Sequence, residues 1–220
     1  MKKQRSGFQK SLDDLLQDIL KMGGLVEENI ARSIESLARQ DLELAEKVFV
    51  VEEIIDRMEL EIEDTCIRLI ATQQPMAKDL RRIGAAFKVI TDLERMGDYA
   101  VDIAKVTKRI GDEPLIKPLI DLPRMAGLVQ KMVKESLDAY VREDVQMAEG
   151  IGKADDEVDS LHKQVFRELL VLMMENPRTI NQATHLLFVS RSLERIADHA
   201  TNIAERVIYL VSGKRVELND

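Results

Sequence analysis

The chain of 220 residues is poor in the residues on which disulfide-rich and β-rich proteins depend. It contains one cysteine, Cys66, no tryptophan, and only 4% aromatic residues. A single cysteine excludes a disulfide within the chain and is typical of a protein from a reducing compartment. The scarcity of aromatic residues disfavours a sandwich or barrel that depends on aromatic cross-strand pairs.

Long hydrophobic runs and an excess of positive charge are lacking as well. The longest apolar run, Leu169 to Met174, is far too short to cross a bilayer. The amino-terminal segment MKKQRSGFQKSLDD has positive charge but no apolar stretch behind it. We therefore predict a cytoplasmic protein with no signal peptide and no direct membrane insertion. The net charge of −8 disfavours general binding of nucleic acid or anionic lipid, because both attract a basic face.

What the chain does have is helical periodicity. Hydrophobic residues make up 45% of it and charged residues 33%, a mixture typical of long amphipathic helices. Apolar side chains recur at three- and four-residue spacing, and prolines interrupt the pattern. We predict an all-α fold whose six helices cover residues 8–39, 42–72, 77–109, 117–142, 145–175 and 180–212.

Three of these helices have a recognisable start. Asp41 and Asp144 are candidate N-caps for the second and fifth helices, because a short carboxylate can accept the free amide hydrogens there. Thr179 with Gln182 has the spacing of a capping box for the sixth helix.

The second half of the chain repeats the first. The residues Met22, Gly24, Leu25, Val26, Ser33 and Asp41 recur in order as Met125, Gly127, Leu128, Val129, Ser136 and Asp144. The segment Leu93-Glu94-Arg95 returns as Leu193-Glu194-Arg195. Identity at polar positions in a fixed order indicates an internal duplication. We predict two tandem three-helix bundles, residues 1–112 and 113–220, related by a pseudo-twofold axis or a translation and joined through the proline-rich stretch 111–123.

Each repeat contains two pairs of carboxylates four residues apart. The pairs are Glu52/Asp56, Glu94/Asp98, Asp155/Asp159 and Glu194/Asp198. Residues at this spacing are neighbours on one helical face, where like charges destabilise the helix. The pattern therefore favours a bound cation, and carboxylate oxygens suit Mg²⁺, Mn²⁺ or iron. Asp102 and Asn202 follow one turn later as additional candidate ligands.

Two other interpretations compete with the metal site. Arg57, Arg95 and Arg195 adjoin the acidic pairs and could neutralise them in a passive structural bundle. A carboxylate-bundle metal-dependent enzyme is the other alternative, but its Glu-x-x-His motif has only one imperfect version, Asp159 with His162. The histidines are interpreted as ordinary helix residues. With no phosphate loop, nucleophile elbow or zinc-type spacing, we predict that the protein is not an enzyme.

Three segments resemble the hallmark motifs of one family. DLERMGDYAVDIAK (Asp92 to Lys105), SLERIADHATNIAERVIYL (Ser192 to Leu210) and ATQQPMAKDLRRI (Ala71 to Ile83) are similar to the signatures of the PhoU family of phosphate-transport accessory proteins. The resemblance extends over nearly the whole chain and implies two tandem three-helix bundles.

The resemblance also implies a function. It implies a negative regulator of phosphate uptake and of the phosphate-starvation response, an adaptor between the ATPase subunit of the phosphate ABC transporter and a sensor histidine kinase. It further implies metal binding by the four acidic pairs, with iron, manganese, magnesium or zinc as the ion. Because long apolar helices favour self-association, we also expect a homodimer.

Overall fold

The computed structural model describes residues 2–218, with side chains from residue 7 onward, and this part of the chain is helical with no strand. Its elements are α1 (Lys2–Arg39), α2 (Leu42–Gln73), α3 (Ala77–Ile110), α4 (Asp121–Arg142), α5 (Val145–Glu175), the 3-10 turn η1 (Pro177–Thr179) and α6 (Ile180–Ser212). The predicted all-α fold is confirmed. None of the helices in residues 2–218 is long and apolar enough to span a bilayer.

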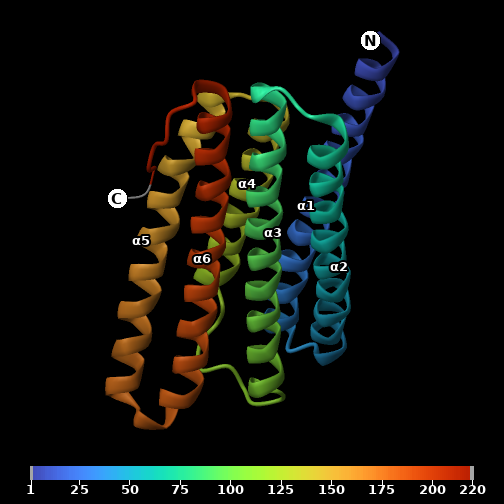
Figure 1. Cartoon of the computed structure of the whole chain (residues 1–220). Coiled ribbons are helices and arrows are strands. Elements are labelled where there is room, and N and C mark those ends of the chain that lie inside the picture. Colours follow the sequence, from blue (N-terminus) through green and yellow to red (C-terminus); the bar gives the residue numbers. More distant parts are fainter. Residues whose placement is uncertain (1, 219–220) are drawn as a thin grey trace.

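The six helices form two antiparallel three-helix bundles that lie side by side (Figure 1). The helices α5, α6, α3 and α2 form one layer in that order, and α4 and α1 form the second layer behind them. The two bundles meet where α3 packs on α6 and α1 packs on α4. The predicted pair of three-helix bundles is therefore correct, and the repeats share one broad contact.

The core is continuous across both repeats. Large side chains of α3 such as Ile90 and Met96 are fully buried, and so are Ile196 and Ile203 of α6. Because α3 and α6 are covered on several sides, they form the central pair of the fold. The helices α2 and α5 lie at the edges of the layer and expose a long face each.

Two of the three predicted helix starts are confirmed. The carboxylate of Asp41 accepts a hydrogen bond from the amide of Leu44 at 2.9 Å, and Asp144 accepts one from Met147 at 3.0 Å. The predicted capping box at Thr179 is wrong. The Thr179 hydroxyl donates to the carbonyl of Asn176 at 2.8 Å and does not cap α6, because η1 intervenes before that helix.

The fourth helix starts at Asp121, later than the predicted residue 117. The side chain of Gln182 holds the linker instead, since it accepts from the amide of Ile116 at 2.6 Å and donates to the carbonyl of Pro114 at 3.1 Å. This contact between distant parts of the chain keeps the segment before α4 out of a helix. At the other end, α1 begins at Lys2, earlier than the predicted residue 8.

Candidate functional site

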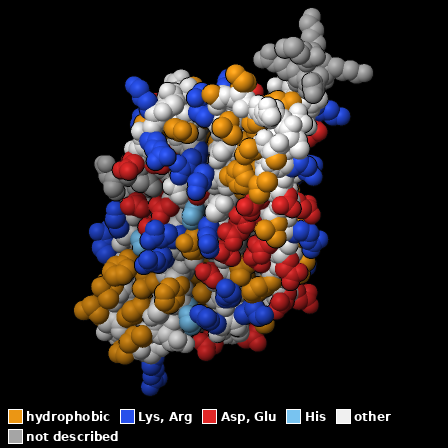
Figure 2. Space-filling view, viewed as in Figure 1, with side chains coloured by type: hydrophobic (Ala, Val, Ile, Leu, Met, Phe, Trp, Pro, Cys, Tyr) orange, Lys and Arg blue, Asp and Glu red, His pale blue; other side chains and the backbone are white. Residues whose placement is uncertain are grey.

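The acidic pairs of the first repeat form one cluster across α2 and α3. Burial raises the pKa of Glu52 to about 7, with further contributions from the charge and hydrogen bond of Asp56 and from the charges of Asp98 and Glu94. The four carboxyl groups are therefore close enough to act on one another. Figure 2 shows acidic side chains gathered over this part of the layer.

Close packing of the two helices brings these carboxyl groups together. Gly97 lies on α3 between Glu94 and Asp98, and a Cβ built there would lie 3.4 Å from the Cδ1 atom of Ile55 on α2. The small residue thus lets the side chain of Ile55 reach α3 beside the acidic pairs. Its equivalent in α6, Ala197, is fully buried.

The second repeat builds an equivalent cluster across α5 and α6. Asp155 is only 9% exposed, and its burial raises its pKa to about 7, helped by the negative charges of Asp198 and Asp159. Burial also raises the pKa of Glu194, again with the charge of Asp198 contributing. The duplication therefore provides two acidic clusters of the same design.

The structure also shows which of two neighbouring acidic residues on α2 and on α5 faces each cluster. Glu53 and Asp156 follow Glu52 and Asp155 in the sequence and are exposed. Glu52 is half-buried and Asp155 is buried. The packed faces of α2 and α5 thus turn Glu52 and Asp155 toward the clusters.

Basic side chains neutralise part of each cluster. In the first, Arg95 lies 3.2 Å from Asp98 and 3.6 Å from Glu94. In the second, the matching distances from Arg195 are 3.0 Å to Asp198 and 3.6 Å to Glu194. Lys163 also lies 3.1 Å from Asp159. Within residues 7–218, no basic side chain lies within 4 Å of the carboxylates of Glu52, Asp56 or Asp155.

The two additional candidate ligands have partners of their own. Asp102 is exposed and pairs with Lys105 at 2.8 Å. Asn202 donates to the carboxylate of Asp92 at 3.2 Å, and His199 contacts the same oxygen at 2.9 Å. Asn202 and His199 therefore contribute to the packing of α6 on α3.

Two residues beside the clusters escaped the sequence-based assignment. Burial raises the pKa of Glu59, whose carboxylate accepts a hydrogen bond from Thr91 at 3.2 Å, and its charge acts on Glu94. The equivalent position in α5 is His162, whose charge lowers the pKa of Glu194 against the effect of burial. The three-residue spacing of Asp159 and His162 is the available signal, and the lack of a histidine at the equivalent position of the first repeat weakens it.

The donor chemistry of both clusters fits a hard cation. Carboxylate oxygens predominate. The pKa values of Glu52 and Asp155 are raised first by burial and then by the neighbouring negative charges, and a cation would relieve that repulsion. In the part of the chain that the structure describes, however, no three acidic, histidine or cysteine side chains converge as a ready ligand set. Ion binding by all four carboxylates of a cluster would require Arg95 and Arg195 to release those that they now hold.

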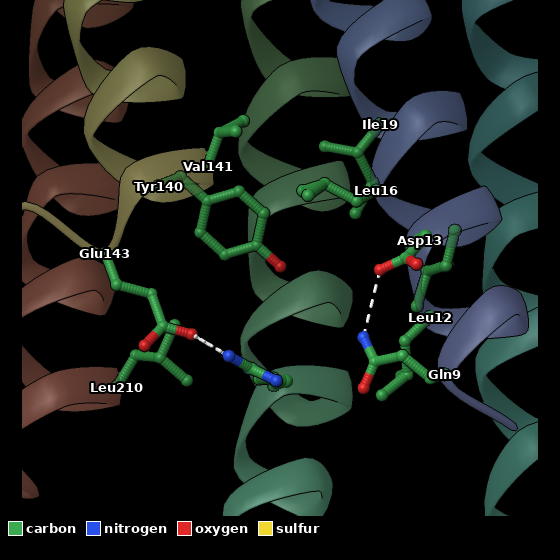
Figure 3. A pocket seen from close by; sticks show the side chains of 11 residues that line it. Gln9, Leu12, Asp13, Leu16, Ile19, Tyr140, Val141, Glu143 and Leu210 are labelled. Atoms are coloured by element: carbon green, nitrogen blue, oxygen red, sulfur yellow. Dashed lines mark hydrogen bonds and ion pairs between the residues drawn. The ribbon is translucent and has the colours of Figure 1, made fainter. Parts of the chain in front are cut away.

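A separate hollow of about 230 Å³ lies between α1, α3, α6 and the end of α4. Figure 3 shows Tyr140 pointing into it toward apolar side chains of α1. Burial raises the pKa of Tyr140, so the hydroxyl stays protonated. Arg82 also lines the hollow, but its Nε atom donates to Glu143 at 2.8 Å. This guanidinium is already paired, and the carboxylates of Asp13 and Glu143 also line the hollow, which disfavours an anion there.

The family model and the curated relatives that match this chain all point to one family. The family model described as PhoU domain matches residues 19–107 and 122–207. A protein of Clostridium acetobutylicum named phosphate-specific transport system accessory protein PhoU homolog is 46% identical over 98% of this chain and 99% of its own length. A homolog of the same name from Caulobacter vibrioides is 43% identical over 95% of this chain and 91% of its own length.

Two solved structures have the same architecture. The crystal structure of PhoU from Pseudomonas aeruginosa superposes with a TM-score of 0.90 at 39% identity, covering 94% of this chain and 100% of that one. The phosphate transport system regulatory protein PhoU from Streptococcus pneumoniae gives a TM-score of 0.89 at 32% identity, covering 96% and 99%.

Proposed function

The chain belongs to the PhoU family, and from that premise we propose that it is a negative regulator of phosphate uptake and of the phosphate-starvation response. The observation that carries the proposal is the match of both repeats to one family whose members are named accessory or regulatory proteins of phosphate transport. These names describe regulation and not catalysis. They support a protein that controls a transporter without being an enzyme.

The regulator would act as an adaptor in the cytoplasm. Its partners would be the ATPase subunit of the phosphate ABC transporter and a sensor histidine kinase. The two-layered arrangement supports this role, because the edge helices α2 and α5 expose long faces on which helices of other proteins can pack. The protein would work as a homodimer, which sedimentation at several concentrations would test.

The two acidic clusters would hold metal ions, with magnesium, manganese, iron or zinc as the candidates. The residues are Glu52, Asp56, Glu94 and Asp98 in the first cluster, and Asp155, Asp159, Glu194 and Asp198 in the second. A bound cation would supply positive charge between helices that otherwise repel each other. Arg95 and Arg195 supply part of that charge in the present structure, and they would compete with the ion for the same oxygens.

Deletion of the gene in its host tests the regulatory function. Alkaline phosphatase activity is measured in phosphate-rich medium, where the starvation response of the wild type is repressed. We expect constitutive activity in the deletion strain and renewed repression when the wild-type gene is returned. Unchanged repression in the deletion strain would show that the protein does not regulate this response.

Metal binding is tested by elemental analysis of protein purified without a histidine tag. Replacement of Glu94 and Asp98 by Gln and Asn should remove the metal of the first cluster while the helical circular dichroism is retained. The matched control is Asp102→Asn, which removes one carboxylate from an exposed position on the same helix. Equal metal content in all three proteins would contradict the assignment of the first cluster.

A further inference from the structure

Exposed apolar side chains gather at the ends of α5 and α6 that lie away from the chain termini. Figure 2 shows these hydrophobic side chains at the lower ends of the two helices. The distal patch consists of Phe166, Leu170, Val171, Met174, Ile180 and Phe188. The exposed fraction is 76% for Met174 and 53% for Phe188, so these are not marginal members of the core.

The patch draws on both helices. Phe166, Leu170 and Met174 recur every four residues and therefore form one stripe along α5. The hydrogen bond of 2.8 Å between His162 and Ser190 fixes the antiparallel register of α5 and α6. In that register Phe188 lies within about half a helical turn of Phe166 along the axis. Exposed apolar side chains of two neighbouring helices thus lie at the same height over about two helical turns.

The first repeat has only part of this face, although it has the same fold. Leu170 and Ile180 correspond to Ile67 and Leu80, which are exposed as well. The residues at the positions equivalent to Phe166, Val171, Met174 and Phe188 are Glu63, Arg68, Ala71 and Lys88. The duplicated scaffold therefore accepts polar, charged or small residues at all four positions. Apolar side chains there are not required for folding, and leaving them in water has a cost that burial against another molecule would remove.

The charges around the distal patch are mostly positive. Arg167, Arg178 and Arg191 are exposed, and among the described residues no carboxylate lies within 4 Å of their guanidinium groups. Glu168 is held by Lys117, which leaves Glu175 as the acidic residue at this end of α5. A positive rim in a chain with a net charge of −8 favours an acidic occupant.

This charge also decides between the possible occupants. A symmetric contact between two copies would bring the arginines of one patch against those of the other, and like charges across an interface cost binding energy. An anionic membrane would attract three arginines, but the net charge of the whole molecule would oppose its approach. An amphipathic helix with acidic residues beside its apolar stripe can cover the apolar patch and pair with the arginines around it.

We therefore propose that the distal patch is the docking surface for an amphipathic helix of a partner protein whose apolar stripe is flanked by aspartate or glutamate. The inference rests on the adaptor role proposed above and assigns one face of the second repeat to it. The docked helix lies along α5 and α6 on the side opposite to α4. Phe166 and Phe188 are buried in the contact, and Arg167 and Arg191 pair with the acidic flanks.

The test is photo-crosslinking in the host cell with the full chain. Benzoylphenylalanine is introduced in place of Phe188, and the crosslinked peptides are identified by mass spectrometry. We expect adducts to one helical segment of another protein that has carboxylates beside an apolar stripe. Benzoylphenylalanine in place of Lys88 is the matched control, and it should give at least tenfold less of this adduct. Adducts only to lipid or to a second copy, or no adduct, would overturn the proposal.

A synthetic peptide of the crosslinked segment then gives the affinity by fluorescence anisotropy. Phe166→Glu and Phe188→Lys restore the residues of the first repeat, and each should weaken binding at least tenfold while the circular dichroism is unchanged. Arg191→Glu should weaken binding and reduce its dependence on salt. Equal affinity in the patch variants would overturn the proposal. The alkaline phosphatase assay of the deletion strain is a separate result, so failure of the regulatory function remains distinguishable from failure of this docking site.

Discussion

Removal of the charge at Asp155 should stabilise the metal-free protein at neutral pH. An aspartate in an unfolded chain has a pKa near 3.8, whereas Asp155 in the folded chain has a pKa of about 7. Well below pH 4 the residue is protonated in both states and does not affect stability. Between pH 4 and pH 7 the unfolded chain releases this proton first, so the free energy of unfolding falls as the pH rises and levels off above pH 7.

The size of the effect follows from the shift in pKa. Each pKa unit corresponds to about 1.4 kcal/mol, so a shift of about three units sets an upper limit of roughly 4 kcal/mol. Water at the outer edge of the cluster and the guanidinium of Arg195 screen the repulsion. We therefore expect Asp155→Asn to raise the free energy of unfolding by about 2 kcal/mol at pH 8, and by well under about 1 kcal/mol at pH 4.

The assay is urea unfolding followed by far-ultraviolet circular dichroism in the presence of EDTA, at pH 4 and at pH 8. The control is Asp156→Asn, which removes the same charge from the exposed neighbouring position and should change stability by less than about 0.5 kcal/mol. Addition of Mn²⁺ should stabilise the wild type more than Asp155→Asn. If Asp155→Asn has no effect at pH 8, or if Asp156→Asn matches it, electrostatic strain at this cluster is refuted.

Three further predictions concern other parts of the fold. Burial, with the charge of Glu63, raises the pKa of Cys66 to about 12, so at pH 8 Ellman's reagent should react with this thiol only after unfolding. Asp144→Ala removes the N-cap of α5 and should lower the free energy of unfolding by about 1 kcal/mol in urea titrations. Burial alone would raise the pKa of Glu143, but the hydrogen bond and charge of Arg82 lower it overall. The stabilisation from this pair is therefore present above the ordinary glutamate pKa and lost in acid. Arg82→Gln should lower the thermal midpoint at pH 7 and have little effect at pH 3.

The sequence determined those features that depend on neighbours along the chain. The starts of α2 and α5 were predictable because Asp41 and Asp144 cap amide groups only three residues away. The two bundles followed from the duplication, since identity at polar positions survives without any knowledge of packing. The four acidic pairs were visible because a spacing of four residues places side chains on one helical face.

Contacts between distant segments were decided by the tertiary structure alone. Gln182 was predicted to cap its own helix and instead holds the linker before α4. Asn202 has the spacing of a ligand, but it lies against Asp92 across the contact between the two repeats. In both cases the partner lies far away in sequence, so no local pattern could identify it.

The two apolar stripes of α5 show most clearly what the sequence leaves open and the packing decides. The sequence contains two apolar stripes along this helix, one with Val165 and Leu169 and one with Phe166 and Leu170. Both have helical periodicity, and their composition does not distinguish them. Only the packing of α4 and α6 buries the first stripe and leaves the second in solvent, because burial depends on which side of a helix its neighbours occupy.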